Sequence, residues 1–166
     1  MGSGKTTLGK KIASLLGLEF IDLDTVITLK EGLTVNQIFK NKGEEYFRQK
    51  EKETLEKLIE NESFVMAVGG GTPCFFNNME LMNNCGLTIY LKLSPAGLYT
   101  RLAGRTTERP LVKNFEKKEL LDYININLAE RENWYLQSKI IIGEKEQKPE
   151  LILGMINDYN PGSGLD

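Results

Sequence analysis

The chain of 166 residues contains no histidine, only two cysteines and a single tryptophan. Without histidine, general-base catalysis by an imidazole and histidine-ligated metal sites are excluded. The two cysteines, Cys74 and Cys85, are too few for a disulfide framework and lack the spacing of a metal site, which fits a reducing cytoplasm. Any proton transfer must therefore rest on carboxylates, lysines, tyrosines or water.

Long apolar runs and a strong charge of one sign are missing as well. No run approaches the roughly 20 apolar residues of a membrane span, and no signal peptide is visible. The net charge is −2, from 21 basic and 23 acidic residues, which argues against a sequence-independent nucleic-acid binder. The length and the 40% hydrophobic content favour one globular domain with its own core.

What the chain does contain begins at its first residues, MGSGKTT. This heptapeptide matches the last part of the phosphate-binding pattern G-x-x-x-x-G-K-[ST], whose first glycine would lie two residues before Met1. Backbone N–H groups of such a loop bind phosphate oxygens, and the following helix directs its positive end at the same charge. The alternative is a glycine-rich turn before an ordinary helix. The predicted nucleotide-binding residues are Gly2, Ser3, Gly4, Lys5, Thr6 and Thr7.

Short apolar strands alternate with helical patterns, which predicts an α/β fold with a mainly parallel sheet. The expected strands are 19–23, 64–68, 87–93 and 140–142. The expected helices are 5–16, one from the capping box of Thr34 and Gln37, one from Gly43 to about Asn61, one starting at Pro95, 118–136 and one starting at Pro149.

Polar and glycine residues follow two of the expected strands. Asp22 and Asp24 end the first strand, where two acids can hold water around Mg²⁺ and accept a proton from a hydroxyl. The alternative is a solvated turn in which Asp24 caps a helix. Three glycines, Gly69–Gly71, end the next strand and would expose backbone N–H groups to a ligand, unless they form only a flexible loop.

Three arginines are further candidates. Arg48 has Glu51 three residues later on the same helical face, and an arginine held by a carboxylate suits a carboxylate ligand. Arg109 lies in a charged segment that could close over a transferring phosphoryl group, and Arg131 lies on a charged helical face. The alternatives are a surface ion pair for Arg48, a solvated loop for Arg109 and a solvated face for Arg131.

The order of these motifs resembles the shikimate kinases. The resemblance runs from Met1 to about Ile156 and rests on MGSGKTT, FIDLD, EEYFRQKE, VGGGTP, ERPL and AERENWY. It implies a three-layer α/β/α P-loop kinase fold with a five-stranded parallel sheet, a lid loop over 105–118 and mobile substrate-binding helices over 25–61. It also implies a cytoplasmic, monomeric enzyme of aromatic amino acid biosynthesis that transfers the γ-phosphoryl of ATP, with Mg²⁺, to the 3-hydroxyl of shikimate.

On the nucleotide side, the resemblance implies that Lys5 contacts the phosphates and Thr6 ligates Mg²⁺. Asp22 would act just outside the metal's own ligands, and Arg109 would be the lid arginine near the β- and γ-phosphates. Pro149 is expected near the nucleotide. The remaining candidates for adenine binding are Arg101 or Arg105 and the loop 143–149.

On the acceptor side, the resemblance implies that Asp24 binds the acceptor hydroxyl and serves as the base. Arg48 and Arg131 would clamp the carboxylate of shikimate. The ring hydroxyls would be contacted by Gly69, Gly70 and Gly71. The predicted catalytic residues are Lys5, Asp24 and Arg109.

The start of the chain departs from the family, which begins with an apolar strand and the first glycine of the phosphate loop. Such a strand lies inside the sheet, so its absence would leave neighbouring backbone groups unpaired at roughly 1–3 kcal/mol for each buried group. We expect the sequence to be truncated or to start at an internal methionine. Residues 1–159 are expected to form one domain, and 160–166 a disordered tail.

Two alternatives stay open from the sequence alone. One is another small-molecule kinase of the same fold, acting on gluconate or a nucleoside monophosphate. The other is a nucleotide-binding protein that the N-terminal truncation has inactivated. The first would differ in its acceptor, and the second would bind ATP without turnover.

Overall fold

A computed structural model describes residues 2–60, 63–103 and 117–159. The strands are β1 Glu19–Asp22, β2 Phe64–Ala67, β3 Ile89–Leu91 and β4 Ile140–Ile142. The helices are α1 Lys5–Leu16, α2 Leu23–Glu31, α3 Val35–Lys42, α4 Glu44–Leu58, α5 Asn78–Cys85, α6 Pro95–Ala103, α7 Lys117–Tyr135 and α8 Pro149–Asp158. Two single-turn 3₁₀ helices, η1 Thr72–Cys74 and η3 Glu144–Glu146, complete the described elements.

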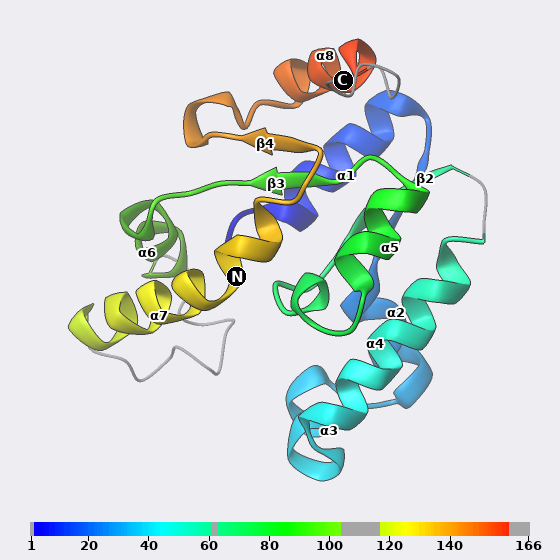
Figure 1. The fold of residues 1–166 in the computed structure, drawn as a ribbon, viewed down its shortest axis with the longest axis vertical. Helices are drawn as coiled ribbons and strands as arrows, with labels where there is room; N and C mark the ends of the chain where they lie inside the picture. The colour runs from blue at the N-terminus through cyan, green and yellow to red at the C-terminus, as the bar shows by residue number, and fades with distance from the viewer. Residues whose placement is uncertain (1, 61–62, 104–116, 160–166) are drawn as a thin grey trace.

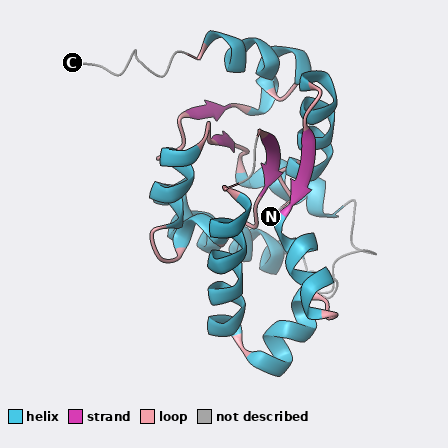
Figure 2. Cartoon of the chain, turned by 90° about the vertical axis from the view of Figure 1, so that its right-hand side faces the viewer, coloured by secondary structure: helices cyan, strands magenta, loops and turns pink. Residues whose placement is uncertain are grey.

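The strands pair in parallel, as the alternation of strands and helices predicts. Strand β1 lies beside β2, with Asp22 opposite Ala67, and β3 lies beside β4, with Ile89 opposite Ile140. Among the described residues these are two separate two-stranded sheets. Figure 2 shows the strands in the interior, surrounded by helices. The α/β class with parallel strands is therefore confirmed.

Helices cover both faces of β3. Ile89 and Leu91 pack into the apolar cluster that α1, β4 and α8 share. Tyr90, between them, must face the opposite side because successive side chains of a strand alternate. Its ring packs on the ring of Tyr135 at the end of α7, with centroids 5.1 Å apart. Layers of helix, strand and helix follow from this alternation.

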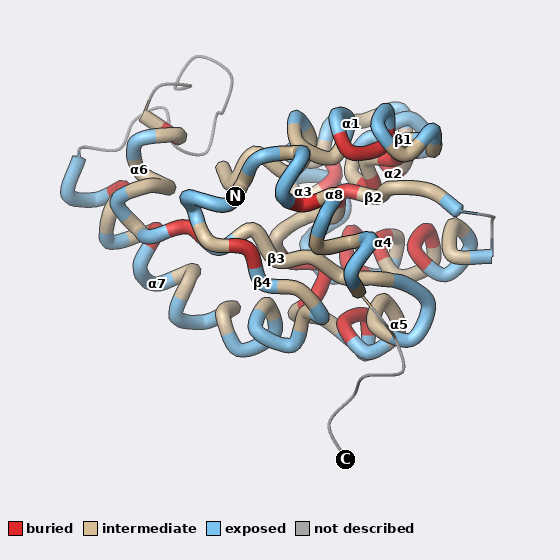
Figure 3. The backbone as a smooth tube through the Cα atoms, turned by 90° about the horizontal axis from the view of Figure 1, so that it is seen from above, coloured by how far each residue is buried: buried red, intermediate tan, exposed pale blue. Residues whose placement is uncertain are grey.

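The buried apolar residues form three clusters. The largest joins α2, α3 and α4, which lie together at one end of the molecule (Figure 1). A second joins α6 to α7, and the third joins α1, β4 and α8. Buried stretches accordingly recur on α4 and at β4 in Figure 3. The fully buried members of the first cluster are Leu23, Ile27, Ile38, Phe47 and Leu55.

Several boundaries differ from the expectation. The first strand ends at Asp22, and Leu23 already begins α2. Asp22, not Asp24, is the N-cap of that helix, and its side chain accepts a hydrogen bond from the Thr25 backbone N–H at 3.4 Å. Strand β3 is shorter than predicted, and the sequence did not predict α5.

Some predicted features lie outside the described residues. These are Arg105, Arg109, the tail 160–166 and most of the lid 105–118, of which Lys117 and Lys118 form the start of α7. Within residues 2–60, 63–103 and 117–159, every helix is too short or too polar to cross a bilayer. Cys74 and Cys85 are both free thiols.

The capping box at the start of α3 gives a prediction for stability. The Thr34 hydroxyl accepts from the Gln37 backbone N–H, and the Gln37 side chain accepts from the Thr34 N–H at 2.9 Å. Thr34→Ala removes the cap, so urea unfolding should show a loss of about 1 kcal/mol.

Thr100→Ala is the matched control. The Thr100 hydroxyl bonds back to the Ala96 carbonyl within α6, and alanine is the better helix former there. We expect this change to be neutral or stabilising. Equal losses in the two variants would contradict the capping role of Thr34.

Candidate functional site

The phosphate loop turns sharply into α1. Gly4 is the N-cap in the left-handed conformation, with φ of 88°, which side chains rarely adopt. The free N–H groups at the start of α1 and the positive end of its dipole make this turn an anion site. Arg101 donates to the Ser3 carbonyl at 2.6 Å, which ties α6 to the loop.

A cavity of about 310 Å³ opens beside this loop. Its volume falls in the range of small-molecule sites. Arg101 also donates to the Gln147 side chain at 3.2 Å, which links α6 to the loop after β4 at the cavity wall. The cavity is lined by Gly2, Ser3, Gly4, Thr7, Leu8, Lys11, Arg101, Gln147 and Pro149. It therefore brings Pro149 together with four of the residues predicted to bind the nucleotide.

The other two loop residues, Lys5 and Thr6, are directed at the end of β1. The Thr6 hydroxyl donates to Asp22 Oδ2 at 3.0 Å, and Lys5 Nζ lies 3.8 Å from the same oxygen. A hydroxyl and a carboxylate side by side at a phosphate loop match the hard oxygen ligands that Mg²⁺ prefers. No cluster of three acidic, cysteine or histidine side chains that could hold a metal occurs among the described residues.

Asp24 lies in the first turn of α2, between two sources of positive charge. Burial raises its pKa above the ordinary value, Lys5 and Arg48 oppose this shift, and Asp22 adds to it. A β-carbon at Gly69 would stand 3.2 Å from Asp24 Oδ1, so the carboxylate faces the glycine segment. This carboxylate therefore lies close to both the phosphate loop and the glycine segment.

Arg48 is not a surface residue. It is 8% exposed, and its NH1 donates to the fully buried Glu51 at 2.7 Å. Its Nε and NH2 donate to Glu44 at 3.2 and 3.0 Å. Its guanidinium also lies 4.4 Å from the centre of the Phe75 ring. The surface ion-pair interpretation of Arg48 is therefore wrong.

Glu51 connects this arginine to the glycine segment. Burial raises the pKa of its carboxyl, while hydrogen bonds from Thr72 and Arg48 oppose the shift. The Thr72 hydroxyl, which is itself buried, donates to Glu51 Oε1. The Asn78 side chain in turn donates to the Thr72 carbonyl at 2.9 Å. A buried polar network therefore runs from α4 through η1 to α5.

Gly69 and Gly71 lie too close to neighbouring side chains for a β-carbon to fit without a shift. A β-carbon at Gly71 would stand 2.5 Å from Arg48 NH2, and one at Gly69 would stand 3.2 Å from Glu51 Oε1. Gly71 has ordinary helical angles, with φ of −83°, so the glycine is required by space and not by backbone conformation. The glycine segment is thus packed against the arginine and is not a free loop.

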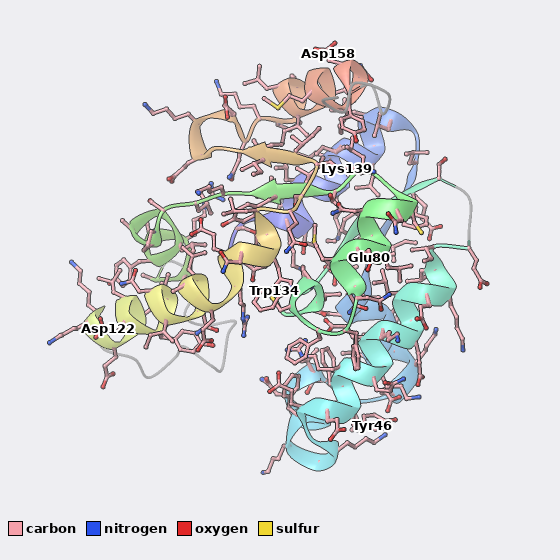
Figure 4. All side chains as sticks on the ribbon, viewed as in Figure 1. Tyr46, Glu80, Asp122, Trp134, Lys139 and Asp158 are labelled. Carbon is pink, nitrogen blue, oxygen red and sulfur yellow. The ribbon has the colours of Figure 1, made fainter. Side chains whose placement is uncertain are left out.

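Arg131 reaches the same region from α7. Its guanidinium lies near the Tyr135 hydroxyl one turn later, and the Tyr135 hydroxyl donates to the Gly70 carbonyl at 2.6 Å. Burial raises the pKa of Tyr135 and that of Cys74, which lies near both Arg131 and Arg48. Trp134, labelled in Figure 4, stands at this end of α7.

The structure therefore groups the predicted residues in two sets. Lys5, Thr6 and Asp22 lie together beside the cavity, and Arg48 and Arg131 converge on the glycine segment that faces Asp24. Sequence reasoning missed Thr72, Tyr135 and Lys11, and it included Gln147 only as part of the candidate loop 143–149. Only Tyr135 had a usable signal, its four-residue spacing from Arg131 in a helical pattern.

Comparisons with known proteins agree on one family. The family profile described as shikimate kinase matches residues 1–159. A shikimate kinase from Phocaeicola vulgatus is 46% identical over 139 residues, which cover 84% of this chain and 79% of that protein. One from Parabacteroides distasonis is 42% identical over 150 residues, covering 90% and 87% of the two chains.

Solved structures give the same result. A shikimate kinase from Bacteroides thetaiotaomicron superposes with a TM-score of 0.87 at 38% identity, covering 95% of this chain and 92% of that one. One from Acinetobacter baumannii, in complex with shikimate, superposes with a TM-score of 0.83 at 32% identity, covering 96% and 91%.

The packing of Gly71 against Arg48 gives a second stability prediction. In Gly71→Ala the new methyl group must displace a guanidinium that Glu44 and Glu51 hold, so we expect a loss of about 1–3 kcal/mol in urea unfolding. Gly154→Ala is the matched control, because nothing lies within 4 Å of its β-carbon position on α8. That change should stabilise by about 0.5–1 kcal/mol. A neutral Gly71→Ala would show that the contact is loose.

Proposed function

The chain belongs to the shikimate kinase family, and from this membership we propose that it transfers the γ-phosphoryl group of ATP to the 3-hydroxyl of shikimate. The products are ADP and shikimate 3-phosphate, on the route to chorismate and the aromatic amino acids. The shikimate bound in the Acinetobacter baumannii structure supports the choice of acceptor.

One observation carries the proposal. Asp24 is close enough to both Lys5 of the phosphate loop and Arg48 of α4 that the charge of each acts on its carboxyl. A carboxylate that feels both the lysine of the phosphate loop and a buried arginine supports the assignment of Asp24 to the point where the acceptor hydroxyl meets the phosphoryl group. Phosphoryl transfer asks a protein mainly for such positioning and charge stabilisation.

Each of the predicted residues has its own role in the reaction. Arg48 and Arg131 bind the carboxylate of shikimate, and the main chain of Gly69–Gly71 contacts its ring hydroxyls. The 3-hydroxyl oxygen attacks the γ-phosphorus, the bond to the bridging oxygen of ADP breaks, and Lys5 stabilises the charge on the phosphates. Asp24 orients the hydroxyl and accepts its proton. Burial raises the pKa of Asp24, which makes this carboxylate a better proton acceptor.

The residues at the end of β1 fit a magnesium ion. Thr6 would bind the ion directly, and Asp22 would contact the groups that surround the ion. When bound, the ion neutralises charge on the β- and γ-phosphates.

Other parts of the assignment belong to the same proposal. Residues 1–159 act as one kinase domain, and 25–61 act as a substrate-binding region, which the separate apolar cluster of α2, α3 and α4 supports. Arg109, in the proposed lid over 105–118, completes the charge stabilisation. The enzyme works as a cytoplasmic monomer without nucleic-acid partners, and its two free thiols support a reducing compartment.

Measuring ADP release with different acceptors tests the function. With ATP and Mg²⁺, we expect shikimate to support turnover and gluconate and AMP to give background only. Turnover with AMP alone would overturn the assignment. ATP binding without turnover of any acceptor would identify a nucleotide-binding protein instead.

Asp24→Asn separates chemistry from nucleotide binding. The amide cannot accept the proton of the acceptor hydroxyl, so kcat should fall by about 10²-fold or more. ATP affinity, measured by equilibrium titration, should stay within about threefold because Asp24 faces the acceptor. A parallel loss of ATP affinity would contradict this role.

The raised pKa of Asp24 also predicts how the stability of the chain depends on pH. A raised folded-state pKa means that ionising Asp24 costs more in the folded chain than in the unfolded chain. Its contribution to stability is therefore present at low pH and is lost as the pH rises through the folded-state pKa. Relative to the unchanged chain, Asp24→Asn should be most stabilised at neutral pH, and the difference should shrink as the pH falls through the folded-state pKa of Asp24 towards the ordinary value of 3.8. Unfolding in urea across this range measures it.

A further inference from the structure

We propose that Tyr135 is a positioning residue. Its hydroxyl keeps Arg131 at a fixed distance from the glycine segment, so that one shikimate molecule can contact both. The proposal rests on the proposed function, because it concerns how the enzyme binds its acceptor, shikimate. It concerns a residue that does not itself need to touch the substrate.

The acceptor site is built from two pieces that come from different parts of the fold. One piece is α4 with the glycine segment, which the close packing of Gly71 on Arg48 and the bond from Thr72 to Glu51 hold together. The other is the end of α7, which carries Arg131. A rigid substrate with its carboxylate and hydroxyls in fixed places requires the two pieces to keep one spacing, since small misplacements are costly.

The Tyr135 hydroxyl contacts both pieces. It donates to the Gly70 carbonyl at 2.6 Å, across 65 residues of sequence, and it lies close enough to Arg131, one turn earlier on α7, that the arginine opposes the rise that burial causes in its pKa. A phenol donates one proton, here to Gly70, and its lone pairs remain available to a neighbouring guanidinium. The arginine, the tyrosine and the glycine carbonyl therefore form a continuous line of contacts.

The surroundings keep this hydroxyl in place. The ring of Tyr135 is packed on that of Tyr90 from β3, which limits its rotation. Burial raises the pKa of Tyr135, so the proton that reaches Gly70 stays on the phenol at neutral pH. Beyond this line, Lys92 and Glu132 pair at 2.9 Å near the same end of α7, but both side chains are substantially exposed and restrain it weakly.

Tyr135→Phe tests the role because it removes the hydroxyl and keeps the ring against Tyr90. We expect the dissociation constant and the KM for shikimate to rise about tenfold, with kcat and ATP affinity within about twofold. The fluorescence of Trp134, the chain's single tryptophan, reports shikimate binding without any turnover. ATP titration of the same sample shows whether the variant is folded.

Tyr90→Phe is the matched control, since it removes the same atom from the neighbouring ring. Its shikimate affinity should stay within about twofold of the unchanged chain. An unchanged affinity in Tyr135→Phe, or an equal loss in the two variants, would overturn the proposal.

A double-mutant cycle separates positioning from general loosening. If the hydroxyl acts through Arg131, Tyr135→Phe should change shikimate affinity by less than about twofold in a chain that already carries Arg131→Ala. The same tenfold loss in both backgrounds would show that the hydroxyl acts elsewhere, and would overturn the proposal.

The binding measurement also separates this proposal from the proposed function. Shikimate binding without turnover would overturn the kinase assignment. The double-mutant cycle would then still decide whether Tyr135 positions Arg131. Absence of shikimate binding by the unchanged chain would overturn both.

Discussion

The buried ion pair between Arg48 and Glu51 is the interaction on which the proposed acceptor site depends. Both residues lie on α4, and each is less than a tenth exposed. Removing one partner of such a pair leaves a charge buried without compensation, at a cost of about 3–5 kcal/mol. The pair also sets the geometry around it, because Gly71 packs on the guanidinium and Thr72 bonds to the carboxylate. The direction of Arg48 and the path of the glycine segment are therefore determined together.

This arrangement also sets the electrostatic environment of Asp24. Burial works against the ionised form of Asp24, while the positive charges of Lys5 and Arg48 favour it. Because burial has the larger effect, the pKa of this carboxylate is raised, and it takes up a proton more readily than a carboxylate in water. It can therefore both orient a hydroxyl and receive its proton, which a fully exposed aspartate at its ordinary pKa would do less well.

Local patterns in the sequence account for much of the fold, and long-range packing accounts for what they miss. The bounds of α1 and β4 match the prediction because a glycine ends α1 and a short apolar run forms β4. The helix of Arg48 has the composition of a charged surface helix, EEYFRQKEKE. The rings of Phe39 and Phe75, which come from other parts of the fold, pack on its guanidinium beside the neighbouring Phe47. The bond from Tyr135 to Gly70 spans 65 residues, which no local pattern reports.

The acidic pair after β1 shows how a boundary error of one residue bears on chemistry. Had the strand continued through both acids, Asp22 and Asp24 would point to one face, as residues two apart in a strand do. Instead Asp22 keeps extended angles as the N-cap, and the helix begins at Leu23, so Asp24 lies in the first helical turn. Asp22 thereby bonds Thr6 of the phosphate loop, whereas Asp24 faces the glycine segment. The change from strand to helix between these two residues is what separates the carboxylate that we propose for the metal side from the one that we propose for the acceptor side.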